Sequence, residues 1–260
     1  MPEPIVSFYD VDDLNELDDE NPDNIGVVNA GSTSAPAQIN IWNNKDGTGN
    51  VSKMENVRIT TVTMNGLSEG DTVVNGKEIV EDQIIAVKSL TLGEEVFTNI
   101  GGVNTKTLAD IRGDQLATPG QPSGTVVDDV GSSLPIGSYY YRISALDETG
   151  ETLAGTESSE VVVGAVDKAV DLSWDAVEGA SSYKIFRTTT SGVYGSTSLL
   201  ATVETNSFTD NLASPDTGEP LSEATVTYGH KHEIQRRAEV STTASAGPMN
   251  WKYRVMYSYV

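Results

Sequence analysis

Apolar and polar residues alternate at every second position in two stretches near the middle of the chain. Residues 170–174 read Val-Asp-Leu-Ser-Trp, and residues 183–187 read Tyr-Lys-Ile-Phe-Arg. A period of two is the pattern of a β-strand with one buried face. The intervening residues 178–182 contain glycine and serine, which favour a turn. The sequence therefore predicts a pair of antiparallel strands that place Trp174 and Tyr183 in a core.

Further short apolar segments occupy the first hundred residues. The expected strands are residues 25–28, 37–42, 57–64, 84–89 and 96–100. The turn sequences between them are residues 43–50, 64–71 and 74–78. Short strands at this spacing are typical of a β-sandwich, and no span has the pattern of a long amphipathic helix. We therefore expect an all-β protein.

Two segments rich in proline, glycine and serine, residues 117–124 and 214–223, have the composition of linkers. Beyond the second, residues 230–240 and 251–259 each alternate, which predicts a terminal hairpin with large aromatic side chains on one face. An isolated hairpin is marginal in water, so it needs a sheet to join. We expect it to return to the first domain, which makes the middle region an insertion. In the alternative, two domains follow each other and the hairpin packs on the second.

The expected fold class is thus all-β, with two β-sandwich domains and the second inserted in the first. The first domain comprises residues 1–116 and is completed by residues 224–260. The second domain comprises residues 117–223.

The chain is strongly acidic and contains no cysteine. Its 38 acidic and 16 basic residues give a net charge of −22, which repels nucleic acid and anionic membranes. The absence of cysteine excludes disulfides, thiolate zinc sites and cysteine nucleophiles. No apolar run is long enough to span a bilayer, and residues 1–4 lack the features of a signal peptide. We expect synthesis in the cytoplasm, no nucleic-acid partner and no membrane insertion.

The middle region resembles fibronectin type III modules. The matching segments are SYYYRISALDETGET (138–152), VDLSWDAVEGASSYKIFRTT (170–189) and NSFTDN (206–211). Trp174 and Tyr183 match the core tryptophan and tyrosine of that family. In the family the Leu-Ser-Trp strand precedes the Tyr-Tyr-Arg-Ile strand, whereas this chain has the reverse order. The resemblance implies a sandwich whose strands are permuted or rearranged.

The two ends of the chain carry a second resemblance. EIQRRAEVSTTASAGPMNWKYRVMYSYV (233–260) is similar to the last two strands of bacterial immunoglobulin-like domains, and residues 39–61 resemble segments of tailed-phage structural proteins. Together the two resemblances imply a tailed-bacteriophage virion structural protein with an immunoglobulin-like domain and a fibronectin type III-like module.

Several consequences follow from this resemblance. The protein would be a non-enzymatic surface decoration, collar, or tail or baseplate accessory protein located in the virion. The first sandwich would anchor it and the second would be displayed. Other virion proteins and further copies of the chain are its expected partners. The alternative is an adhesion module that binds a host-surface glycan, and a third possibility is a hydrolase, which requires a pocket with paired carboxylates.

Few residues suggest catalysis or metal binding. His230 and His232 face the same way in a strand, which suits a metal, but two exposed histidines are the favoured interpretation. Neither histidine has an obvious serine or cysteine partner for a triad. The acidic residues 10–24 offer calcium ligands in Asp10, Asp12 and Asp13 or in Asp18, Asp19 and Glu20. Their spacing does not match an EF-hand, so a solvated loop is favoured.

The remaining candidates are aromatic residues and one tripeptide. Trp42, Trp174 and Trp251 would form a sugar-stacking platform if exposed, but their alternating strands favour core packing. The Arg-Gly-Asp sequence at residues 112–114 lies in an expected linker region and is assigned no role. We expect no catalytic residue, no cofactor and no bound metal.

Overall fold

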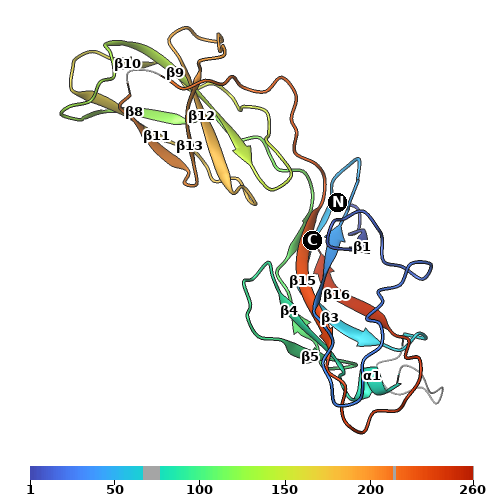
Figure 1. Cartoon of the computed structure of the whole chain (residues 1–260). Coiled ribbons are helices and arrows are strands. Elements are labelled where there is room, and N and C mark those ends of the chain that lie inside the picture. The colour runs from blue at the N-terminus through green and yellow to red at the C-terminus, as the bar shows by residue number, and fades with distance from the viewer. Residues whose placement is uncertain (67–76, 213–214, 260) are drawn as a thin grey trace. The chain divides into compact units, whose positions relative to one another are not determined.

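The computed structural model describes residues 1–66, 77–212 and 215–259 (Figure 1). The expected turns at residues 64–71 and 74–78 lie largely outside these described residues. The chain is almost entirely β, as the alternating pattern predicted, and the described helix α1 (Lys77–Glu81) has five residues. No helix in the described part is long and apolar enough to cross a membrane.

The chain divides into two compact units. Unit 1 comprises Met1–Asp114 and Tyr228–Val260, and unit 2 comprises Gln115–Thr227. Each unit has its own hydrophobic core of buried side chains.

Unit 1 contains two sheets. The five-stranded sheet has the order β1-β2-β15-β4-β5. Its strands are β1 (Val6–Tyr9), β2 (Ala37–Asn43), β15 (His230–Ala238), β4 (Ile85–Ser89) and β5 (Thr98–Ile100). The other sheet has the order β16-β3-β6, and β7 also pairs with β3. Its strands are β16 (Lys252–Tyr259), β3 (Val51–Val62), β6 (Lys106–Thr107) and β7 (Ile111–Gly113).

A single core joins the two sheets of unit 1. Ile41 and Ile234 enter it from the five-stranded sheet, and Val57 and Ile59 enter it from the other. All four side chains are fully buried. This core explains the alternation in the longer strands, because alternate residues such as Ile39 and Ile41 of β2 or Ile85 and Val87 of β4 point into it.

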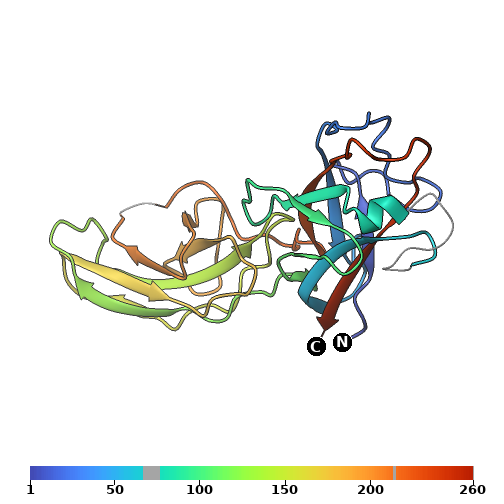
Figure 2. The ribbon, with the colours of Figure 1, turned by 90° about the horizontal axis from the view of Figure 1, so that it is seen from below.

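The last two strands complete unit 1, but not as a hairpin. β15 lies between β2 and β4, so both of its edges are already paired (Figure 1). β16 instead pairs with β3 in the other sheet (Figure 2). The expectation of a hairpin at residues 230–240 and 251–259 is therefore wrong, because the connecting segment crosses from one sheet to the other.

Two smaller expectations for unit 1 are also wrong. Residues 25–28 form no strand, and Gly26 adopts a φ of 79°, which interrupts the extended backbone between Ile25 and Val27. Arg112 lies on β7 and not in a linker.

Unit 2 contains a three-stranded and a four-stranded sheet, with the orders β14-β11-β8 and β10-β9-β12-β13. The first holds β14 (Ser207–Asp210), β11 (Lys168–Ser173) and β8 (Ser123–Asp128). The second holds β10 (Val161–Val163), β9 (Gly137–Leu146), β12 (Ser182–Thr188) and β13 (Leu199–Val203). One core again draws on both sheets.

The two alternating stretches in the middle of the chain form β11 and β12, but these strands do not pair with each other. They belong to different sheets, since β11 pairs with β8 and β14 while β12 pairs with β9 and β13. Their core residues are confirmed. Trp174 and Tyr183 are both buried, and their rings meet edge to face with centroids 5.4 Å apart.

A buried charged group also links the two sheets of unit 2. Arg187 on β12 donates to both oxygens of Asp210 on β14, at 2.8 and 2.9 Å, and the Tyr141 hydroxyl donates to Asp210 at 2.8 Å. Burial, followed by the Asp210 charge, raises the pKa of Tyr141. Removing one member of such a pair leaves an uncompensated charge in the core.

Candidate functional site

The outer edge of β16 has no paired strand among the described residues. The direction of its peptide groups follows from β3. The carbonyls of Thr61 and Val57 accept from Gly102 and Leu108, which lie on the β6 side of β3. Because backbone direction alternates along a strand, the peptide N–H and C=O groups of Thr60 point toward β16, where Arg254 is the paired residue.

It follows that the peptide groups of Tyr253 and Val255 point away from β3, and by alternation so do those of Tyr257. We call these outward-pointing groups the β16 edge. β16 is the longest strand at a sheet edge in the described part of the chain. It contains no proline and no acidic residue. Such an edge is a template for pairing with another strand.

The side chains along this edge are unusually accessible for residues that face a core. Tyr253, Val255 and Tyr257 pack against the unit 1 core but remain only partly buried. Val6 and Phe8 of the edge strand β1 are partly buried as well, and Phe8 stacks on Tyr253 with centroids 5.8 Å apart. The predicted aromatic face of the last strand is therefore real, but the fold covers it incompletely.

The opposite face of β16 is basic in an otherwise acidic protein. Lys252, Arg254 and Met256 alternate with the core-facing residues and lie on the other face of the strand, where they are partly exposed. Lys252 pairs with Asp19, and Arg254 donates to the carbonyl of Gly66. In the ladder with β3, Met256 lies opposite the exposed Arg58. Ser258 lies opposite Glu55, because β3 has a bulge at Asn56.

The acidic residues 10–24 form ordered contacts and are not simply a solvated loop. Asp13 accepts hydrogen bonds from Asn40, Trp42 and Lys231 at 2.6–2.8 Å. Burial alone raises the pKa of Asp13, but these bonds outweigh it and the net pKa is lowered. Asp13, one of the candidate calcium ligands, is therefore already bound to donors from the protein. Asp23, in the same segment, likewise pairs with Arg236.

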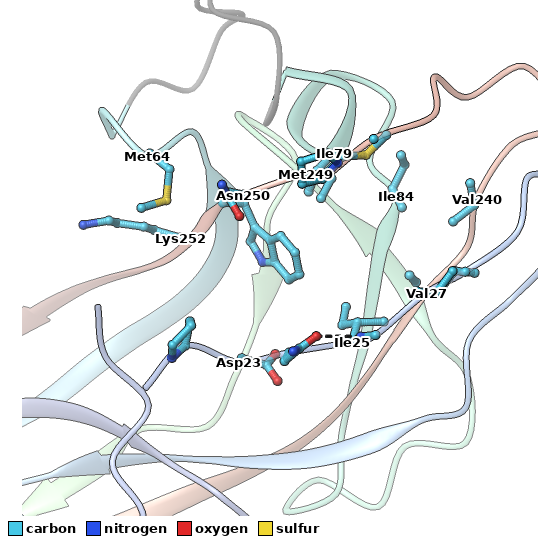
Figure 3. A pocket seen from close by; sticks show the side chains of 18 of the residues that line it. Asp23, Ile25, Val27, Met64, Ile79, Ile84, Val240, Met249, Asn250 and Lys252 are labelled. Carbon is cyan, nitrogen blue, oxygen red and sulfur yellow. Dashed lines mark hydrogen bonds between the residues drawn. The ribbon is translucent and has the colours of Figure 1, made fainter. Parts of the chain in front are cut away.

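A groove lies between this N-terminal segment and the residues that precede β16. Its volume is about 1080 Å³, and residues 17–30 and 244–253 form its walls. Figure 3 shows Asp23 and Ile25 on one side, with Asn250 and Lys252 across from them. Trp251 also lines it and is partly buried. We call this space the Trp251 groove.

The lining of the Trp251 groove is partly apolar and includes the buried core residues Ile79 and Ile84. Asp23 is held in place by Arg236 and accepts a hydrogen bond from the Tyr253 hydroxyl at 3.0 Å. Burial and the charge of Asp23 raise the pKa of Tyr253 well above its usual value. The groove therefore combines an aromatic ring with fixed polar groups.

One histidine has a serine partner that sequence reasoning missed. His232 Nε2 lies 2.8 Å from Ser89 Oγ across β15 and β4. Both side chains are buried, so a substrate carbonyl has no route to Ser89 Oγ in this conformation. Burial lowers the pKa of His232 to about 4, while Glu94 and Glu233 oppose that shift. The expectation of two exposed histidines is wrong, since His230 is buried too.

The three tryptophans differ in how far they are buried. Trp174 lies in the unit 2 core, as expected. Trp251 is partly buried and packs against the unit 1 core, so the expectation of core packing holds for it as well. Trp42 is partly buried and belongs to neither core, so the expectation is wrong for this tryptophan. The indole of Trp42 donates to Asp13, and Trp251 faces the groove.

Comparison with protein-family models, with curated proteins and with solved structures returned no significant match for this chain. The functional interpretation therefore rests on the residues of the chain itself. The β16 edge had a signal in the sequence, namely a final strand rich in tyrosine and free of proline and acidic residues. The Ser89–His232 contact had none, because it joins residues on different strands far apart in the sequence.

Proposed function

We propose that the chain is a non-enzymatic structural component of a tailed-phage particle. In this proposal it is a surface decoration, a collar, or a tail or baseplate accessory protein. Unit 1 anchors the chain to the particle and unit 2 is displayed. The class of particle comes from the sequence resemblance, and the feature that carries the assembly role is the β16 edge.

The proposal includes the architecture of the two units. Unit 1 is an immunoglobulin-like sandwich, and unit 2 is a fibronectin type III-like sandwich inserted into it. Two observations support this arrangement. Each core draws side chains from two sheets, and the two strands that follow unit 2 both enter the sheets of unit 1. The name of each sandwich rests on the sequence motifs.

The β16 edge supports assembly because proteins that act alone normally protect such an edge. They shorten edge strands, place a charge or proline in them, or cover them. In unit 2, for example, the edge strand β13 is partly covered, since Leu199 exchanges backbone hydrogen bonds with residues 216–218. Among the described residues, side chains of the N-terminal segment contact β16, but no backbone hydrogen bond of this kind reaches the outward groups of Tyr253, Val255 and Tyr257. A net charge of −22 keeps copies apart over most of the surface, and this repulsion is weaker at β16, which has no acidic residue.

The test of this function is the composition of particles from a culture that produces the chain. Particles are purified by density gradient, labelled with an antibody against the chain and viewed by immunogold electron microscopy. We expect labelling at one structure of the particle and a fixed copy number by quantitative mass spectrometry. If the chain remains in the particle-free fraction, the proposed function is wrong.

A second candidate function is supported by the Trp251 groove. A partly exposed indole beside carboxylate and amide groups suits the stacking and hydrogen bonding of a sugar, so the groove favours glycan binding. A glycan array with the native chain and with Trp251→Ala tests this. Binding that the substitution abolishes supports the second function, and the absence of any bound glycan contradicts it.

A further inference from the structure

We propose that β16 pairs antiparallel with β16 of a second copy of this chain, about a twofold axis at Val255. This inference rests on the proposed assembly function and names the partner at its contact. The argument uses the direction of the peptide groups, the match of the strand with itself and the side chains that pairing would cover.

The first step is the hydrogen-bonding pattern. The outward groups on β16 belong to Tyr253, Val255 and Tyr257, as derived from the bonds that β3 makes on its other side. A twofold axis at Val255 places Tyr253 opposite Tyr257 of the second copy. Val255 then lies opposite Val255 of the second copy. Both kinds of pair join residues whose peptide groups point outward, as the hydrogen-bonded pairs of an antiparallel ladder require. A shift by one residue would set outward groups against inward ones.

The second step is the match between side chains on the solvent face. In the same register Arg254 lies opposite Met256 of the second copy, and Lys252 lies opposite Ser258. No two like charges face each other directly, although β16 itself has two basic residues. A strand that is complementary to itself is what a twofold interface needs, because each contact occurs twice.

The third step is the apolar surface that pairing covers. Tyr253, Val255 and Tyr257 are partly exposed although they face the core. A second strand against the β16 edge sets two tyrosine pairs across the axis and shields these side chains from water. Aromatic pairs across strands are among the contacts that stabilise a sheet. Pairing therefore completes a sheet that unit 1 leaves open.

The charge of the chain makes a second copy and a foreign acidic strand distinguishable by experiment. Two copies each carry a charge of −22, so they repel at long range and salt strengthens their association. An acidic strand bound to the basic face of β16 would instead be released by salt. The direction of the salt effect separates the two partners.

The experiment measures the dimer dissociation constant of the full chain by sedimentation equilibrium, with lysine and glutamate substitutions at Met256 and, as a control, at Ser258. Met256→Lys sets a lysine opposite Arg254 of the second copy, and Met256→Glu sets a carboxylate there. We expect the dimer dissociation constant to rise about tenfold for the first and to fall by a similar factor for the second, since each pair occurs twice.

The matched control is the same pair of substitutions at Ser258, which would face Lys252 of the second copy. Within one chain Met256 neighbours Arg58, whereas Ser258 neighbours Glu55. Within one chain a new lysine is therefore repelled at position 256 and attracted at position 258. Across the proposed dimer it is repelled at both positions, because it faces Arg254 or Lys252 of the second copy. Urea unfolding of each variant measures the effect within the chain.

The inference holds if lysine weakens and glutamate strengthens association at both positions. It is overturned if the native chain stays monomeric at the highest soluble concentration, or if all four variants associate like the native chain. The reverse order of the variants overturns it in favour of an acidic strand. A monomer that is nevertheless found in purified particles refutes only this inference, whereas a dimer that is absent from particles refutes the proposed function.

Discussion

Protonation of His232 is expected to destabilise unit 1 as the pH falls. The side chain is 1% exposed, lies against Ser89 and has a pKa lowered to about 4 by burial. In the unfolded chain its pKa is about 6.5. The folded state therefore binds the proton less tightly than the unfolded state. The contribution of neutral His232 to the unfolding free energy is fully present above the pKa of the unfolded state and is lost as the pH falls toward the pKa of the folded state.

The magnitude follows from these two pKa values. Between about pH 7.5 and pH 5, the linkage relation gives a loss of about 2 kcal/mol, and the loss reaches about 3 kcal/mol near pH 4. The charged groups that face His232 are Glu94 and Glu233, and Lys106 is bonded to Glu94. The pKa of Glu94 is lowered in spite of its burial, because Lys106 and the Ser89 amide bond to it, so this carboxylate stays mainly ionised between about pH 7.5 and pH 5.

The assay is urea unfolding at a series of pH values, followed by tryptophan fluorescence in a Trp174→Phe background. The remaining tryptophans, Trp42 and Trp251, lie in unit 1 and so report on the unit that contains His232. His232→Gln in the same background removes the titration and leaves His230 in place. The difference in unfolding free energy between the two proteins should shrink by about 2 kcal/mol on going from about pH 7.5 to pH 5. A difference that does not change with pH would refute the reasoning.

Three further predictions concern the contacts that hold each unit together. Asp210→Asn breaks a buried charge pair in unit 2 and should lower its unfolding free energy by about 3–5 kcal/mol, measured by Trp174 fluorescence in a background in which Trp42 and Trp251 are replaced by phenylalanine; a loss below about 1 kcal/mol would contradict this. Asp23→Asn leaves the buried Arg236 without its carboxylate, so residues 17–30 should exchange their amides faster; unchanged exchange would show that the pair does not hold the segment. Gly229→Ala should cost more stability than Gly26→Ala. Both glycines have a φ near 80°, but only at 229 would a Cβ lie 2.4 Å from a backbone oxygen, and equal costs would exclude that clash as the cause.

The sequence predicted which residues form strands better than it predicted how the strands pair. Alternation identifies a half-buried strand from its own residues, and β11 and β12 were both found in this way with Trp174 and Tyr183 in the core. It contains no information on which sheet each strand joins. The turn residues after β11 and β15 suggested hairpins, whereas both connections cross between sheets.

The candidate sites depended even more on tertiary contacts. The acidic segment was expected to be solvated because of its composition, but Lys231 and Arg236 on β15 bind its carboxylates from far along the chain. Burial of His232 likewise follows from the central position of β15. By contrast, the β16 edge was partly visible in the sequence, because its tyrosines required a surface to pack against.

Amide exchange on the β16 edge is the most direct test of the central claim that this edge is where copies of the chain associate. Two-dimensional NMR of the native chain at low and high concentration would compare the amides of Tyr253, Val255 and Tyr257 with that of Arg254, which is paired with β3 in either case. The account predicts that the three outward amides exchange rapidly at low concentration and become protected at high concentration, while Arg254 is protected throughout. Outward amides that exchange equally fast at both concentrations, in a sample whose mass increases, would contradict it and assign association to another surface.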